Sequence, residues 1–143
     1  MMIGFENYVY TQIYGALENA YGAGVVKMGG EYVDTPPKFP FVTVEQIDSY
    51  VKRSRRTTNI ENMDTVSYEV NVYSNKKNNR KSEAISIMAV VNHAMASIGF
   101  TRTMMNPVPN LSNSTIYRLT ARYSADAEEE IIGDDTVYTV YQN

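Results

Sequence analysis

The sequence of 143 residues contains no cysteine, no tryptophan and a single histidine. Without cysteine the chain can form neither a disulfide nor a Cys-ligated metal centre, and it has no thiolate nucleophile. With one histidine it also has little material for acid–base catalysis near neutral pH. These absences disfavour an enzyme, and they leave packing as the source of stability. We therefore expect no catalytic residue, no cofactor and no metal.

Long apolar runs are absent as well, because no stretch approaches the roughly 20 apolar residues that a membrane helix needs. The first residues, Met1 to Glu6, contain neither the positive nor the apolar region of a secretory signal. We expect a protein that is made and kept in cytoplasm, or in whatever is assembled there. The share of hydrophobic residues, 43%, and of charged residues, 20%, is ordinary for a folded domain. The length fits one domain, residues 1–143.

The one histidine, His93, lies within a predicted helix and flanks its apolar stripe. No second histidine or cysteine is available to complete a metal site with it. No Gly-x-Ser-x-Gly motif accompanies it, and Gly22-Ala23-Gly24 has Lys27 where a dinucleotide motif would place its third glycine. We interpret His93 as a partly buried structural residue.

Two helices are indicated by apolar spacing. Residues 6–21 repeat apolar side chains at helical intervals and end at a Gly-Ala-Gly stop. Residues 82–98 form the second helix, with Ser82 as its N-cap and Gly99 as its stop. Its expected core stripe consists of Ala84, Ile85, Met88, Ala89, Met95 and Ala96. Its other side carries Ile87, Val90 and Ala94, which we expect to be buried either against the protein's own fold or at an interface with a neighbouring subunit.

Strands are indicated by β-branched or alternating residues in 41–47, 66–73, 115–124 and 136–141. Residues 25–40 are predicted to form a loop with at most one short strand, and Pro107 and Pro109 are predicted to lie in another loop. The polar stretch 48–65 is expected to extend its two flanking strands into a projecting arm. The predicted class is α+β, with an antiparallel or mixed sheet of about four strands, two main helices on one face and a projecting β-hairpin arm.

Charge is divided unevenly along the chain. Residues 50–81 contain eight Lys or Arg and three acidic residues, whereas residues 120–143 contain one Arg and six acidic residues. The basic part could be a nucleic-acid face, a solvated surface, or one half of a head-to-tail contact between copies, of the kind that closes rings. The basic interface residues of the arm and of the following turn are Lys52, Arg53, Arg55, Arg56, Lys76, Lys77, Arg80 and Lys81.

The acidic surplus belongs to a predicted connection, residues 126–135. Its carboxylates lack the alternating spacing of a calcium loop, so a solvated loop is the plain interpretation. These carboxylates are Glu128, Glu129, Glu130, Asp134 and Asp135.

The layout resembles the tail terminator (tail completion) proteins of long-tailed bacteriophages. The resemblance rests on an N-terminal helix and Phe39-Pro40-Phe41-Val42-Thr43-Val44-Glu45 entering a strand. It continues with Tyr68-Glu69-Val70-Asn71-Val72-Tyr73-Ser74 leading into a Lys/Asn-rich turn and a helix ended by Gly99-Phe100, and with Tyr117-Arg118-Leu119-Thr120-Ala121-Arg122-Tyr123 before a closing strand.

The resemblance implies a structural virion protein of the tail or neck. It implies a homo-oligomeric ring, typically of six copies, at the head-proximal end of the tail tube, with the major tail tube protein and the head-completion (neck) protein as partners. Genome DNA must pass through such a ring without binding, and we therefore expect the acidic carboxylates of residues 128–135 near the lumen. The alternatives are a head-side connector or minor capsid subunit, and a small nucleic-acid-binding regulator that uses the eight basic residues.

Overall fold

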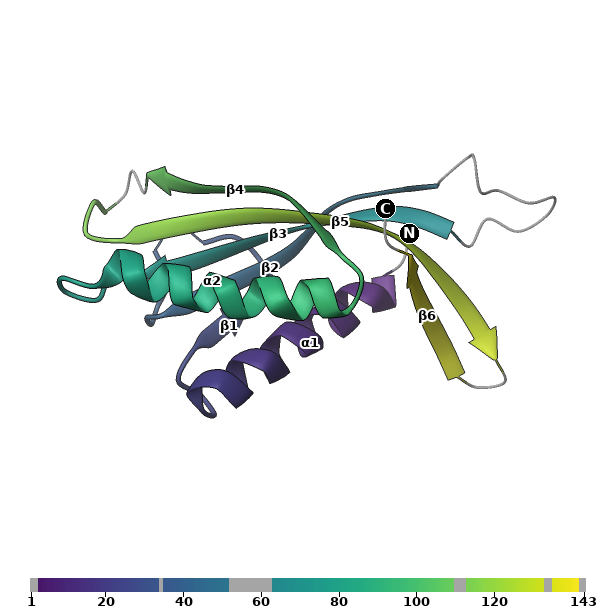
Figure 1. Cartoon of the computed structure of the whole chain (residues 1–143), viewed down its shortest axis with the longest axis horizontal. Coiled ribbons are helices and arrows are strands. Elements are labelled where there is room, and N and C mark those ends of the chain that lie inside the picture. Colours follow the sequence, from purple (N-terminus) through teal and green to yellow (C-terminus); the bar gives the residue numbers. More distant parts are fainter. Residues whose placement is uncertain (1–2, 34, 52–62, 110–112, 133–134, 142–143) are drawn as a thin grey trace.

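Two helices pack on one face of a mixed six-stranded sheet in the computed structural model, which is an α+β fold (Figure 1). The structure describes residues 3–33, 35–51, 63–109, 113–132 and 135–141. The sheet order is β1-β2-β3-β5-β4, with β6 pairing β5 as well. The predicted fold class is confirmed. The expected number of about four strands was too low. Residues 101–109 form a strand in a segment interpreted as a loop, and residues 27–29 form the one short strand allowed for in the segment 25–40.

Helix α1 spans Ile3–Tyr21 and helix α2 spans Arg80–Ser97. The predicted N-cap, Ser82, was wrong, because the helix starts earlier and Asn79 occupies the cap position without a side-chain cap hydrogen bond. The predicted stop at Gly99 is confirmed. Its φ of +94° lies in the left-handed region, where glycine is favoured.

The strands run antiparallel to their neighbours except for the short first strand, which pairs with β2 in parallel. A bulge interrupts β2 between Gln46 and Asp48. In order along the chain, the strands are β1 (Lys27–Gly29), β2 (Phe41–Val51), β3 (Met63–Ser74), β4 (Thr101–Pro109), β5 (Tyr117–Ile132) and β6 (Asp135–Tyr141).

Strand β4 occupies the segment that its two prolines suggested was a loop. It lies at an edge of the sheet and pairs with β5 on one side. Proline is tolerated on an edge strand where the missing N–H would have faced outward. The strand is exposed along most of its length and shows no alternation of buried and exposed residues. The sequence of this strand therefore lacks the period-2 alternation that predicts a half-buried strand.

The main core lies between the helices and the sheet. Phe5 of α1 stacks against Phe100, and Tyr68 of β3 meets both rings edge-on. All three side chains are buried. Around them pack the helix residues Val9, Ile13, Leu17, Ala84, Ile87, Met88, Val91 and Met95, together with the strand residues Val42, Val44, Val66, Val70, Val72, Leu119, Ala121, Tyr123, Ala125 and Ala127.

Helix α2 is rotated relative to the predicted stripe. Ile87 is 1% exposed and Ala94 6% exposed, so both belong to the protein's own core and are not available as interface residues. Val90 is half-buried and packs against the same core. Ile85, predicted to be core, is 47% exposed. Because apolar side chains occur nearly all around this helix, its spacing alone did not decide which side faces the sheet.

Candidate assembly surfaces

The structure describes four of the eight predicted basic residues. Lys76, Lys77, Arg80 and Lys81 are exposed in and after the turn that follows Ser74; we call this group the basic turn. The arm residues Lys52, Arg53, Arg55 and Arg56 lie outside the described residues, between the end of β2 and the start of β3 at Met63. With 12 residues, β3 separates its two ends by about 36 Å at roughly 3.3 Å per residue. The basic turn is therefore far from the place where the predicted arm begins.

The acidic segment was predicted as a loop, and that prediction was wrong for residues 126–132, which continue strand β5. The register places Glu128 opposite Met63, at the arm end of β3. Residue 126 is buried, and its Oδ1 accepts a hydrogen bond of 2.7 Å from Thr65 Oγ1. Pairing with β3 and β6 thus overrides the weak strand propensity of acidic residues.

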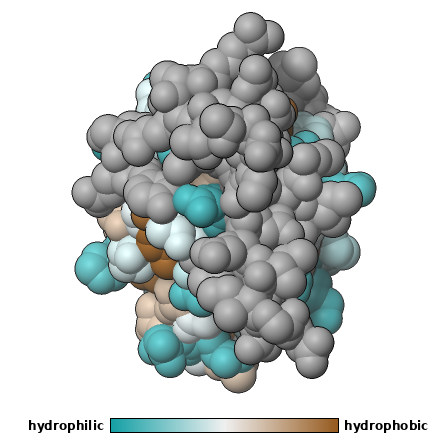
Figure 2. All heavy atoms as spheres, turned by 90° about the vertical axis from the view of Figure 1, so that its right-hand side faces the viewer, coloured by the Kyte–Doolittle hydropathy of each residue, from teal (hydrophilic) through white to brown (hydrophobic). Residues whose placement is uncertain are grey.

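Beyond Glu128, strand β5 has β6 as its only described neighbour. Residues 129–132 pair with residues 135–138 and form what we call the β5–β6 ribbon. It carries Glu129, Glu130 and Asp135 in sequence, while Asp134 lies outside the described residues. Figure 1 shows the ribbon leaving the helix-covered part of the sheet at the right. Figure 2 looks at this end, where the described surface combines hydrophilic side chains with a hydrophobic area.

Polar side chains connect β3 and β5 on the sheet face opposite the helices. Asn71 Oδ1 accepts hydrogen bonds from Arg118 Nε at 2.9 Å and from Thr120 Oγ1 at 2.6 Å. The Arg118 guanidinium also lies 4.5 Å from the centre of the Tyr32 ring. These contacts hold the segment that follows β1 against the sheet. They join the fold to itself and provide no nucleophile with an adjacent base.

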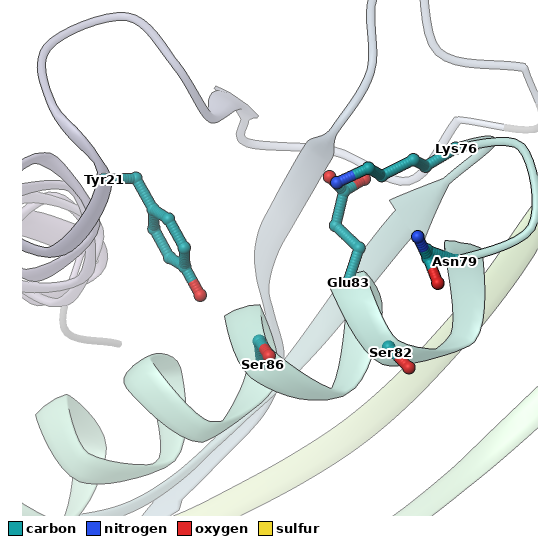
Figure 3. A pocket seen from close by; sticks show the side chains of 6 residues that line it. All are labelled: Tyr21, Lys76, Asn79, Ser82, Glu83 and Ser86. Atoms are coloured by element: carbon teal, nitrogen blue, oxygen red, sulfur yellow. The ribbon is translucent and has the colours of Figure 1, made fainter.

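A pocket of about 370 Å³ lies beside the basic turn, between the end of α1 and the start of α2 (Figure 3). Ser74 Oγ donates a 2.6 Å hydrogen bond to Glu83 Oε1, which fixes that carboxylate. Burial and the nearby Glu83 carboxylate both raise the pKa of Tyr21. Its lining residues are Tyr21, Lys76, Asn79, Ser82, Glu83 and Ser86.

His93 is exposed on α2, so its predicted partial burial was wrong. Together with Ala16, Ala20, Ala89 and other residues it lines a groove of about 520 Å³ between the two helices. Among the described residues, no group of three or more His, Cys, Asp or Glu is placed to hold a metal ion. In the same part of the chain, neither helix has both the length and the apolar character needed to cross a membrane.

No family model and no curated protein sequence matches the chain. The structure is similar to a solved structure entitled "Cryo-EM Structure of an Extracellular Contractile Injection System, PVC sheath/tube terminator in extended state". The alignment has a TM-score of 0.47 and 12% sequence identity. It covers 95% of this chain, which spans 57% of that chain. At this score and identity the similarity does not assign a function.

Proposed function

We propose that the chain is a structural subunit that assembles with copies of itself into a ring of a virion tail or neck. Within this class we propose a tail terminator, which closes the tail tube at its head-proximal end and meets the head-completion protein. The proposal combines the sequence resemblance with one structural observation, the β5–β6 ribbon.

The ribbon supports assembly because two strands by themselves are marginally stable in water. Residues 129–132 have no described partner strand other than β6, whereas residues 117–128 of the same strand also pair with β3. The helix layer covers the sheet, and the ribbon continues past it (Figure 1). A neighbouring subunit packed against the ribbon would supply the missing contacts.

Charge supports a contact between unlike surfaces. The ribbon is acidic in sequence, and the arm between Val51 and Met63 is basic in sequence. Opposite charge favours docking of the ribbon of one subunit at the arm of the next, which is a head-to-tail contact and closes a ring when the rotation between subunits permits. The basic turn, at the other end of β3, is then left for a different partner, the tube or the neck protein.

Two experiments on purified protein test the ring. Reversing the arm charges (Lys52→Glu, Arg53→Glu, Arg55→Glu, Arg56→Glu) should abolish rings seen by electron microscopy, and adding Glu129→Lys and Glu130→Lys should restore them in part. The matched control reverses the basic turn (Lys76→Glu, Lys77→Glu, Arg80→Glu, Lys81→Glu), which should leave rings intact and weaken attachment to the tube or neck. Rings that tolerate the arm reversal would contradict this contact.

The place of the ring is tested on intact tails. Labelled chain should appear as one ring at the head-proximal end of the tail. A ring found on the capsid side of the junction would favour a head-side connector, and absence from particles together with salt-dependent binding to duplex DNA would favour a nucleic-acid-binding regulator.

The lumen is a separate proposal. If Glu128, Glu129 and Glu130 line the channel, replacing all three by lysine should allow rings to form and join heads while DNA release slows, because lysines bind phosphates. Failure of ring formation would place these residues at the subunit contact. Fully infectious particles carrying the three lysines would refute the lumen placement.

A further inference from the structure

The described sheet has two sides at which another strand could add, and parts of both are obstructed. Strand β4 forms one side, with β6 in line with it along the same side of β5. Strand β2 forms the other side, where β1 pairs with residues 41–43 alone. A strand edge with free N–H and C=O groups is a template for pairing with another chain. Which backbone N–H groups point outward decides where pairing can occur.

The register gives the direction of these groups. Hydrogen-bonded and non-hydrogen-bonded pairs alternate along an antiparallel ladder. Pro107 and Pro109, which have no N–H, lie opposite Leu119 and Tyr117. These are therefore the non-hydrogen-bonded pairs, and the even-numbered residues of β5 direct their N–H groups toward the β4 and β6 side.

The same alternation continues along β5 into β6. The β3 ladder is uninterrupted from residue 117 to residue 128 of β5, the β6 ladder is uninterrupted from residue 126 to residue 132, and the two ladders overlap. Glu128 and Thr139 form a hydrogen-bonded pair, and so do Glu130 and Val137. It follows that Thr136 and Tyr138 direct their N–H groups outward, away from β5.

On β2 the outward direction is fixed by a side chain. The Gln46 N–H donates a 3.1 Å hydrogen bond to Glu6 Oε2 of α1, so it points away from β3. Tyr68, opposite Gln46, is therefore a non-hydrogen-bonded position of β3, and Ser67 and Thr65 are hydrogen-bonded positions. After the bulge, Asp48 and Tyr50 lie opposite Ser67 and Thr65 and form the hydrogen-bonded pairs. Ser49 and Val51 therefore direct their N–H groups outward.

Two obstructions remove part of the remaining edge. On β4, Pro107 and Pro109 occupy outward positions and offer no donor. On β2, strand β1 covers residues 41–43 and Glu6 occupies the Gln46 N–H. Among the described residues, the outer edges of β6 and of β2 beyond its bulge have neither a proline nor a partner strand.

We propose that β6 of one subunit adds to β2 of the next, with Thr136 and Tyr138 on one edge facing Ser49 and Val51 on the other. The sheet thereby continues from subunit to subunit. This inference rests on the assembly of copies proposed above, and it names the backbone groups that make the contact.

The topology makes a second copy the fitting partner. Residues 48–51 of β2 lie level with residues 64–67 of β3, 124–127 of β5 and the end of β6 at residues 140–141. Thr136 and Tyr138 lie farther along β6, so the two open edges are on opposite sides of the sheet and offset along the strands. Strands β2, β3, β5 and β6 alternate in direction, so β6 beside the β2 of another copy continues the antiparallel order. The contact joins two different edges, which is the head-to-tail type. It also brings the acidic ribbon next to the basic sequence that follows β2.

Proline substitution tests the edge directly, because proline at an outward position deletes one donor and keeps the subunit's own ladder. Thr136→Pro and Ser49→Pro should each lower the assembled fraction at a fixed protein concentration at least tenfold in sedimentation velocity. The side-chain controls Thr136→Val and Ser49→Thr keep the N–H and should assemble normally. Met105→Pro is the matched proline control, since Met105 is an outward position on the edge that prolines already obstruct.

Hydrogen exchange provides the second readout and does not depend on variants. The amides of Thr136, Tyr138, Ser49 and Val51 should exchange rapidly in the dilute subunit and slow at least tenfold in the ring. If no oligomer forms at any concentration or on added tail tubes, the proposed function fails. If rings form while these amides remain fast, or while Thr136→Pro and Ser49→Pro assemble like Met105→Pro, the edge pairing is overturned and the ring remains.

Discussion

The two ends of strand β5 lie in different surroundings. From Tyr117 to Glu128 the strand is paired with β3, and the apolar residues on one side of this stretch are buried under the helices. From residue 129 to Ile132 it pairs with β6 alone among the described residues. The first part, which we call the body, is stabilised by the protein's own core. In the described part of the chain the ribbon has two strands where the body has at least three, so backbone pairing stabilises the ribbon less than the body.

The largest expected difference between body and ribbon is in hydrogen exchange of the unassembled subunit. The Val70 amide, in the middle of the sheet, should be protected at least about 1000-fold, since it opens with global unfolding. The Val137 amide, although paired with residue 130, should be protected less than about 10-fold, because a two-stranded ribbon opens locally. Mass spectrometry of peptides from both regions measures this. Equal protection would show that the ribbon is stable by itself.

The body can be weakened selectively from helix α2. Ile87→Ala should lower the free energy of unfolding by about 2–5 kcal/mol, because it removes a buried side chain and leaves a cavity. Ile85→Ala, two residues away and 47% exposed, should change it by no more than about 0.5 kcal/mol. Urea denaturation of the monomer compares the two. If the exposed position costs as much as the buried one, the assigned helix orientation is incorrect.

Gly99, between α2 and β4, lies close to strand β6. A Cβ at this position would lie 2.8 Å from Val140 Cγ1 of β6, and its φ is positive. Gly99→Ala should therefore destabilise the subunit by roughly 1–3 kcal/mol. Gly15→Ala is the control, because nothing lies within 4 Å of its added Cβ and alanine favours a helix by about 0.5–1 kcal/mol. The two substitutions should shift Tm in opposite directions. A Tm unchanged by Gly99→Ala would contradict the close contact with Val140.

Alkaline pH should weaken the body through two buried tyrosines. Burial raises the pKa of Tyr123 to about 12, against a smaller lowering by Arg102, and burial raises the pKa of Tyr73 to about 12, against a lowering led by Arg118. In the unfolded chain these phenols lose their protons near pH 10. Their stabilising contribution is complete below pH 10 and is lost as the pH rises toward 12. Tyr123→Phe should flatten the fall in Tm between pH 10 and 11.5. An unchanged slope would argue against a contribution of Tyr123 ionisation to this fall.

The smallest effect is expected at the helix-free face of the sheet. Arg122 Nε lies 3.2 Å from Glu69 Oε1, and the arginine side chain is 51% exposed. Arg122→Ala should cost no more than about 0.5 kcal/mol, because exposed ion pairs are screened by water and salt. Asn71→Ala, in the same face and 1% exposed, should cost about 1–3 kcal/mol, since it leaves the bonded groups of Arg118 and Thr120 without their acceptor. If urea denaturation gives similar losses of unfolding free energy for Arg122→Ala and Asn71→Ala, burial does not distinguish these two contacts.

Much of the fold follows from periodicity that the chain carries locally. The alternation in residues 66–73 and 115–124 predicted two strands that the structure pairs, and the helix stop at Gly99 was correct. The edge strand β4 was missed because neither of its faces is regularly buried. The basic turn and the charge difference were visible in composition. The distance along β3 between the basic turn and the acidic residues was not visible, because it depends on which strands become neighbours.

The sequence by itself determined the α+β class, the ends of the main strands near residues 41 and 74, and the lack of cysteine chemistry, because each of these depends on residue type or on local spacing. The tertiary structure decided which side of α2 is buried, with Ile87 inward and Ile85 outward. It also decided that residues 126–132 extend a strand and that β2 and β6 end on opposite sides of one strip. These features depend on pairing between residues far apart in the chain, and the free energy of that pairing exceeds the weak local preferences of acidic and proline-containing segments.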